Sequence, residues 1–169
     1  RRDIAGLLSD LVGAVNERLD AGKVKGPDHY LVIFGLHRAR DLREEDGGFG
    51  RGFGMDEKEV TASPSENFDT LLRAGPEVGV HTVAWCDTYA NVTRAVPRRA
   101  IREFRTRIAG AMSNEDSMSL FDDPAAARLD KPHRLVMFDY DRPGVLEKFR
   151  PYALPVDSWL KEVGKILKA

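Results

Sequence analysis

The chain alternates between amphipathic stripes and short apolar runs, a pattern that predicts helices interleaved with strands. Apolar residues at helical spacing predict an amphipathic helix over about 3–20, stopped by Gly22. A near-continuous apolar run at 29–34 predicts a buried strand with cover on both faces. A second buried strand is predicted over 80–86. Both predicted strands have the length of ordinary strands in globular proteins.

Shorter elements of both kinds follow along the rest of the chain. Helices are predicted at 66–74 with Ser65 as N-cap, at 88–94, at 97–104, at 114–121 and, as a closing amphipathic helix, at 156–167, and strands at 107–112, 134–138 and 145–149. A turn sequence at 141–144 predicts that the last two strands pair as a hairpin. We therefore expect a single α/β domain over 1–169, with three layers, a mostly parallel sheet, and a C-terminal β-hairpin and helix.

The stretch 43–63 is polar and rich in glycine, which predicts a long flexible loop. Its glycine cluster at 47–54 is not followed by the Lys and Ser or Thr that a phosphate-binding P-loop requires. The spacing does not match a dinucleotide-binding fingerprint either. Arg51 leaves open a second interpretation, a loop that contacts phosphates within a larger assembly.

Composition narrows the classes of function. The net charge is -1 over 169 residues, so no global basic field favours nucleic acid or an anionic membrane. A lone cysteine excludes an internal disulfide framework and fits a reducing cytoplasm. No apolar run approaches the roughly 20 residues that span a bilayer, so this segment is expected to make no membrane contact. The chain starts with Arg almost directly in a helical pattern, as a fragment of a longer protein does.

The side chains that could carry metal or nucleophilic chemistry are scattered. The four histidines are His29, His37, His81 and His133. None are paired at i, i+4, and there is one cysteine, so we predict no metal site. Cys86 with the adjacent Asp87 leaves open a hydrolase that uses either residue, although a free cysteine that ends a buried strand is more often an inert core thiol.

Asp87 stands where a predicted strand ends, the place where open α/β sheets bind their ligands. A second interpretation is that Asp87 caps the helix that begins near Tyr89. The sequence leaves both open.

A locally basic segment follows between 98 and 107. Its arginines are Arg98, Arg99, Arg102, Arg105 and Arg107. Such a run is usually a solvated helix face, and the alternative is a contact with DNA phosphates. The candidates for phosphate contact are Arg98, Arg99, Arg102 and Arg107. The neighbouring Glu103 and the acidic stretch 115–123 weaken the DNA interpretation.

Four segments, taken in order, resemble one known family. The strand LVIFGL at 31–36 occupies the place of a Walker B strand, and FDTLLRAGPEVGVHTV at 68–83 resembles the family pattern LARAGRAAGIHLVLATQRP. The segment TRIAGAMSNEDS at 106–117 resembles TRIAFRVSS…DSR, and AAARL with RLVMF at 125–138 resembles the closing L…GRGDMLY hairpin. Over about 28–154 the chain thus resembles the C-terminal half of the motor domain of FtsK/SpoIIIE-type ATPases, in the HerA–FtsK superfamily.

The resemblance implies a RecA/P-loop-NTPase-like sheet that lacks its P-loop portion, because the Walker A loop would lie upstream. It also implies lost chemistry. Gly35 and Leu36 replace the Asp-Glu pair that holds Mg²⁺ and orients water, and Asp87 replaces the sensor Gln. The family's arginines fall on Ala111 and Met118, for which Arg94, Arg98 and Arg107 are open as substitutes.

The function that the resemblance implies is a lobe of an ATP-dependent DNA or protein translocase, a class that includes motors of cell division. ATP and Mg²⁺ are cofactors of the family, and none is expected to bind tightly to this fragment alone. Residual nucleotide contact would come from Gly35, Leu36, His37 and Asp87.

A degenerate lobe of this kind would act structurally or as a regulator. Its partners would be other lobes or subunits of the motor, which forms a hexameric ring in some members, and double-stranded DNA. The parent would be cytoplasmic or attached to a membrane through other segments. The alternative function is a non-hydrolytic DNA-binding or protein-interaction module that uses the segment 98–107.

Overall fold

A computed structural model describes residues 4–22, 26–42, 62–142 and 144–168. The predicted flexible loop at 43–63, with its glycine cluster and Arg51, lies outside the described residues except for its last two positions. The chain divides into two compact units, Arg1–Arg105 and Thr106–Ala169, which are described separately. The expectation of a single domain stays a prediction.

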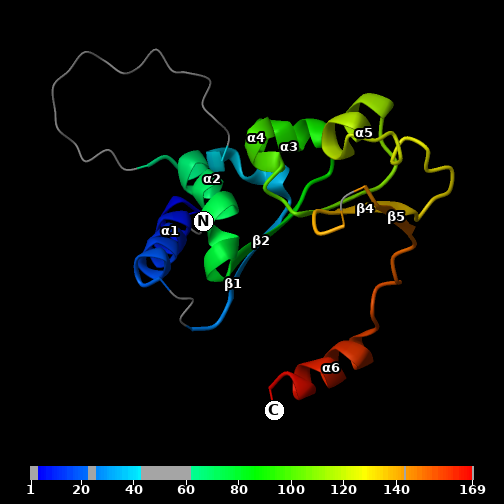
Figure 1. The fold of residues 1–169 in the computed structure, drawn as a ribbon. Coiled ribbons are helices and arrows are strands. Elements are labelled where there is room, and N and C mark those ends of the chain that lie inside the picture. The colour runs from blue at the N-terminus through cyan, green and yellow to red at the C-terminus, as the bar shows by residue number, and fades with distance from the viewer. Residues whose placement is uncertain (1–3, 23–25, 43–61, 143, 169) are drawn as a thin grey trace, which may run out of the picture. The chain divides into compact units, whose positions relative to one another are not determined.

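The first unit holds two strands and most of the helices. Its elements are α1 (Ile4–Asp20), β1 (His29–Phe34), the 3₁₀ turns η1 (Leu36–Arg38) and η2 (Arg40–Leu42), α2 (Pro64–Ala74), the 3₁₀ turn η3 (Gly75–Val78), β2 (Val80–Trp85), α3 (Tyr89–Ala95) and α4 (Arg98–Ile101). Strands β1 and β2 pair in parallel from His29 opposite Val80 to Phe34 opposite Trp85 (Figure 1).

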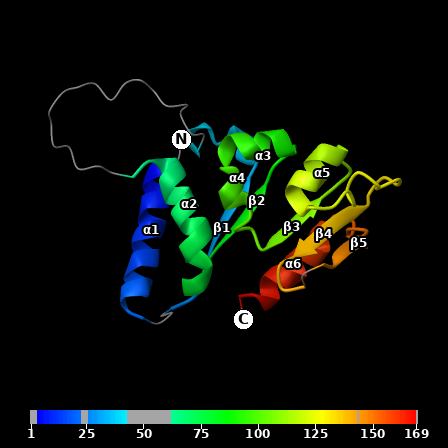
Figure 2. The same cartoon turned by 45° about the horizontal axis from the view of Figure 1, so that its top comes forward.

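One side of this sheet is covered by helices. Helix α2 packs against β2, and α1 lies alongside α2 (Figure 2). The largest fully buried side chains of the unit are Leu8, Val15, Leu36, Leu42, Phe68, Leu71, Val80 and Val96. Arg18 near the end of α1 donates to the carbonyl oxygens of Val78 at 2.8 Å and Pro27 at 2.9 Å. These bonds hold the end of α1 against the residues that come shortly before β1 and β2.

Within the described residues of the first unit, no element covers the other side of the sheet, so the predicted cover on both faces is not found there. Tyr30, Val32 and Phe34 of β1 are 64%, 68% and 80% exposed, and Val83 and Trp85 opposite them on β2 are exposed as well. Alternate residues of a strand point to opposite faces, so these five share one face. The sequence is apolar at both sets of positions, and hydropathy alone therefore could not reveal that one set lacks cover.

The second unit is built on an antiparallel sheet. Its elements are β3 (Thr106–Ala109), α5 (Asn114–Phe121), β4 (Leu135–Asp139), β5 (Leu146–Phe149) and α6 (Asp157–Ile166). The strand order is β3-β4-β5, with β4 and β5 forming the predicted hairpin. A small core joins α5 to the sheet, made of Ala109, Phe121, Ala125, Ala126 and Val136. Helix α6 is present where predicted, and no residue of it is buried.

Ser117 fixes the end of α5 from inside this core. Its side chain is fully buried, donates to the carbonyl oxygen of Asp123 at 2.6 Å and accepts the N–H of Ala126 at 3.1 Å. The hydroxyl thereby satisfies two backbone groups that would otherwise be buried without partners.

The described residues thus form an α/β protein with two sheets, one of two parallel strands and one of three antiparallel strands. The mixed class was predicted correctly. One mostly parallel sheet was not, because the third strand pairs with the hairpin rather than with β1 or β2. The N-cap of α2 is Ser63, in a capping box with Glu66, and not Ser65. Among the helices of the described residues, none has the length and apolarity needed to cross a membrane.

Candidate functional site

The candidate site lies where β1 and β2 end. Because the strands run in parallel, their carboxyl ends meet at one edge of the sheet, the edge where α/β proteins bind ligands. Beyond β1, Gly35 adopts a left-handed conformation with φ of 88°, and its N–H donates to the carbonyl oxygen of Trp85 at 3.1 Å. This bond extends the strand pairing by one residue. The chain then reverses into η1.

The turn η1 sends two neighbouring side chains in different directions. Leu36 is 2% exposed and belongs to the hydrophobic core. His37 instead reaches the end of β2, where its Nδ1 lies 3.4 Å from Oδ1 of Asp87. A left-handed residue costs little for glycine, which explains the residue type at position 35.

Three different chemical groups meet at this edge. The Sγ of Cys86 lies 3.6 Å from the same Oδ1 of Asp87. One nitrogen of His37, the sulfur of Cys86 and one oxygen of Asp87 all lie within 4.8 Å of one another. The cluster therefore combines imidazole, thiol and carboxylate from two loops that are distant in sequence.

The carboxylate of Asp87 is held by its own neighbours. Oδ1 accepts the N–H of Thr88 at 2.8 Å and the amide of Asn91 at 2.9 Å. The hydrogen bond from Asn91 is the main cause that lowers the pKa of Asp87, and His37 and the Thr88 N–H act in the same direction. Asp87 is not the cap of α3, because the Thr88 side chain accepts the N–H of Asn91 and occupies that role.

The thiol of Cys86 shows the opposite tendency. Burial raises the pKa of Cys86 above its usual range. A nucleophilic cysteine is normally activated by a lowered pKa. The raised pKa therefore does not favour the hydrolase alternative that uses Cys86 as a nucleophile.

The four residues expected to contact a nucleotide form two pairs that differ in their surroundings. His37 and Asp87 come together at the strand ends. Gly35 and Leu36 shape the turn and fill the core, so neither offers a group to Mg²⁺ or water. Sequence reasoning missed that Cys86 joins His37 and Asp87. The available signal was the parallel pairing of the two strands, which places both strand ends together.

The arginines proposed for phosphate contact are distributed over both units. Arg98, Arg99 and Arg102 are exposed in the first unit, and Arg99 lies 3.7 Å from the buried carboxylate of Asp69. Arg107 belongs to the second unit, where its guanidinium stacks 4.1 Å over the ring of Phe138. Two of the four candidates therefore have a structural role, Arg107 by stacking and Arg99 by ion pairing.

Three further positions singled out by the resemblance are Arg94, Ala111 and Met118. Arg94, one of the open substitutes, donates to the side chain of Asn91 at 3.2 Å. Ala111 and Met118, which stand where the family has arginines, are exposed and uncharged. Neither side chain can therefore bind phosphate by charge.

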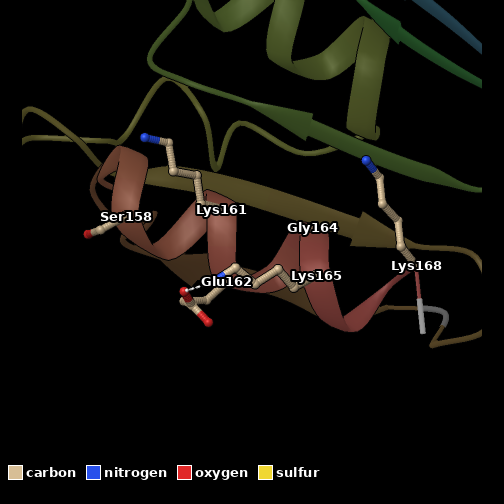
Figure 3. Close-up of a pocket in the computed structure, with 6 residues that line it drawn as sticks. All are labelled: Ser158, Lys161, Glu162, Gly164, Lys165 and Lys168. Carbon is tan, nitrogen blue, oxygen red and sulfur yellow. Dashed lines mark hydrogen bonds and ion pairs between the residues drawn. The ribbon is translucent and has the colours of Figure 1, made fainter.

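A shallow hollow runs along α6 in the second unit. It is lined by Ser158, Lys161, Glu162, Gly164, Lys165 and Lys168. Figure 3 shows Lys161 and Lys168 pointing away from the ion pair that Lys165 forms with Glu162 at 2.7 Å. These residues come from α6 and the turn that follows it, and their charged groups do not converge. This surface is the flank of a helix and not a binding pocket.

Comparison of the chain with models of protein families and with curated proteins found no match. The likeness to FtsK/SpoIIIE-type ATPases therefore rests on the four segments quoted above. What it implies about function is carried forward as a proposal.

Proposed function

We propose that this chain is the C-terminal part of a degenerate FtsK/SpoIIIE-type motor lobe, which serves as a structural or regulatory part of an ATP-dependent DNA or protein translocase. The observation that carries the proposal is the parallel pairing of β1 with β2. In an active relative the Walker B carboxylates and the sensor act on one nucleotide, so their strand ends must be neighbours. Here the position of the Walker B carboxylates is followed by His37, and the position of the sensor is occupied by Asp87. These two side chains lie at one sheet edge.

The chemistry of hydrolysis is missing from that edge. Phosphoryl transfer depends on a metal ion and on groups that position the attacking water. Gly35 has no side chain, and Leu36 is buried in the core. Asp87 keeps a lowered pKa, so it is ionised at neutral pH and adds a negative charge near the place of the phosphates. These residues do not fit Mg-ATP, and the lobe is therefore inactive by itself.

The open face of the parallel sheet supports a role inside a larger assembly. Its exposed side chains are Tyr30, Val32, Phe34, Val83 and Trp85. Contiguous exposed apolar patches mark interaction sites. The face bears no charged side chain suited to nucleic acid. We assign it to a Walker A-bearing half of such a motor lobe, since the resemblance covers only the other half of that domain.

The first test is calorimetric titration of the chain with ATP and Mg²⁺. The expected result is no saturable binding in the micromolar range and no ATP turnover. Micromolar binding together with turnover would contradict the inactive-lobe proposal. The Asp87→Asn variant should also fail to hydrolyse ATP, because removing the charge restores neither the metal ligand nor the water-positioning group.

The second test concerns the open sheet face. The Walker A-bearing half of an active FtsK/SpoIIIE-type motor lobe is expressed as a separate polypeptide and titrated against this chain. Binding is expected, with a loss of at least about tenfold in the Val32→Asp variant, because a charge would be buried at the interface. The matched control is Leu154→Asp, at an even more exposed apolar residue of the second unit. Failure to bind, or equal weakening by both variants, contradicts the assignment.

A further inference from the structure

The cluster at the ends of β1 and β2 has the composition of a transition-metal site. Imidazole nitrogen, thiolate sulfur and carboxylate oxygen are the three ligand types that Zn²⁺ takes in proteins. His37, Cys86 and Asp87 supply one of each, within 4.8 Å of one another. A mixed set of this kind differs from a group of surface carboxylates, which attracts hard cations weakly and without a fixed geometry.

The distances in the cluster match the edges of a zinc tetrahedron. Tetrahedral bonds of ordinary length separate nitrogen from oxygen by about 3.4 Å and sulfur from oxygen by about 3.6 Å. The corresponding distances are 3.4 Å between His37 Nδ1 and Asp87 Oδ1 and 3.6 Å between Cys86 Sγ and the same oxygen. The third edge, from the sulfur to a ring nitrogen of His37, is at most 4.8 Å and closes by up to about 1.2 Å to reach its ideal length.

We propose that His37, Cys86 and Asp87 bind one Zn²⁺ at the sheet edge, with a fourth coordination position open to water or to a ligand from a partner. Three protein ligands with an open position are typical of accessible zinc sites, whereas purely structural sites are closed by four. Asp87 is exposed, which leaves solvent access to the fourth position.

Neighbouring groups already orient the ligands. Asn91 and the N–H of Thr88 hold the carboxylate of Asp87 by hydrogen bonds. The left-handed turn at Gly35 directs His37 toward β2. Such outer contacts fix ligand orientation and tune metal affinity. When the Zn–S bond forms, the thiol proton of Cys86 leaves to solvent, and no oxidation or reduction is involved.

This proposal departs from the expectation of no metal site that the sequence supported. One cysteine and dispersed histidines contain no linear zinc motif, and the three ligands converge only through the parallel strands. The proposal stands on the geometry of the cluster alone. It can therefore fail while the assignment to a motor lobe holds, and it can hold if that assignment fails.

The test titrates Zn²⁺ into the full chain after removal of bound metal with a chelator. We expect one Zn²⁺ per chain and an upward shift of the thermal midpoint, because a ligand that binds only the folded state stabilises it. Cobalt(II) is the second probe. Its complex should show the sulfur-to-cobalt charge-transfer absorption, which reports coordination by Cys86 directly.

Variants assign the ligands one at a time. His37→Gln, Cys86→Ser and Asp87→Asn should each weaken Zn²⁺ binding by about 100-fold or more, since even loss of an outer-shell group costs about 10- to 100-fold. Asn91→Ala should fall near the lower end of that outer-shell range. The matched control is His81→Gln, a histidine on β2 outside the cluster, which should bind Zn²⁺ like the parent chain.

Circular dichroism of each variant separates loss of a ligand from loss of the fold. The proposal is overturned if no one-to-one binding occurs, if the cobalt complex lacks the sulfur band, or if His37→Gln and His81→Gln bind equally well. Any of these outcomes would mean that the His37–Asp87 contact is an ion pair and nothing more.

Discussion

The two units use strands in opposite ways, and the candidate chemistry follows that difference. In the first unit the parallel strands end at the same edge, where His37, Cys86 and Asp87 gather. In the second unit neighbouring strands run antiparallel, so their ends alternate between edges. Its buried polar residue, Ser117, serves the backbone and not a site. Strand direction, more than composition, decides where functional groups can converge.

The two sheets also rest on different helices. The parallel pair depends on α2 for one face and leaves the other apolar face exposed. The antiparallel sheet is joined to α5 through a core centred on Phe121 and Val136. A sheet held from one side should depend strongly on the side chains of that side.

The largest effect is expected from Phe68→Ala. Phe68 is 1% exposed on α2, and truncating a buried Phe costs about 3–5 kcal/mol of unfolding free energy. Urea denaturation at low temperature measures the loss. The control is Val32→Ala on the open face, which should change stability by about 0.5 kcal/mol or less. Comparable losses of unfolding free energy for the two variants would show that both faces of the parallel sheet are covered. The contrast between its two faces would then not hold.

Ser117→Ala tests the polar core of the second unit. The substitution leaves the buried N–H of Ala126 and the carbonyl of Asp123 without this partner, which should cost about 1–3 kcal/mol. Ser119→Ala, an exposed serine on the same helix, is the matched control and should be nearly neutral. A neutral Ser117→Ala would mean that water replaces the hydroxyl.

Thr82→Val should stabilise the first unit. The Thr82 hydroxyl on β2 is buried and has no hydrogen-bond partner within the described residues. Replacing it with a methyl group of similar size removes an uncompensated polar atom, for a gain of about 1 kcal/mol. Thr93→Val removes a hydroxyl that donates to the carbonyl of Ala90, so it should bring no gain. A loss on Thr82→Val would reveal a partner for that hydroxyl in solution.

The smallest expected effect concerns the rate at which Cys86 is alkylated and not the free energy of unfolding. Burial raises the pKa of Cys86, so the metal-free folded chain holds less reactive thiolate at pH 8 than an unfolded chain does. Alkylation by iodoacetamide should therefore be slower in the folded chain. Its rate should still rise as the pH passes the ordinary pKa of a thiol. Faster alkylation of the folded chain would show that the site stabilises the thiolate.

Much of the local structure could be predicted from the sequence. Strand β1 and helix α5 have the predicted bounds, and the hairpin of β4 and β5 follows from its turn sequence. The helix expected at 97–104 shortened to α4 at Arg98–Ile101, and the strand expected at 107–112 became β3 at Thr106–Ala109. Both errors occur in a segment where charged residues interrupt the apolar periodicity.

The arrangement of strands and the cluster could not be predicted in the same way. Hydropathy describes each strand alone, and pairing depends on which neighbours are present in the chain. Asp87 was singled out because it ends a strand, which is a local property. Its contact with His37 depends on the register of β1 with β2 and on the turn at Gly35, and neither is written in the spacing of the residues.

The turn at Gly35 finally bears on the evolutionary history of the chain. An aspartate at that position would have to adopt a left-handed backbone, and a glutamate at position 36 would enter the core that Leu36 fills. Introducing the two carboxylates of a Walker B motif at these positions one at a time would thus destabilise this fold. If the chain descends from an active motor, substitutions at positions 35 and 36 alone would not reverse the change. The backbone at the end of β1 would also have to be rebuilt.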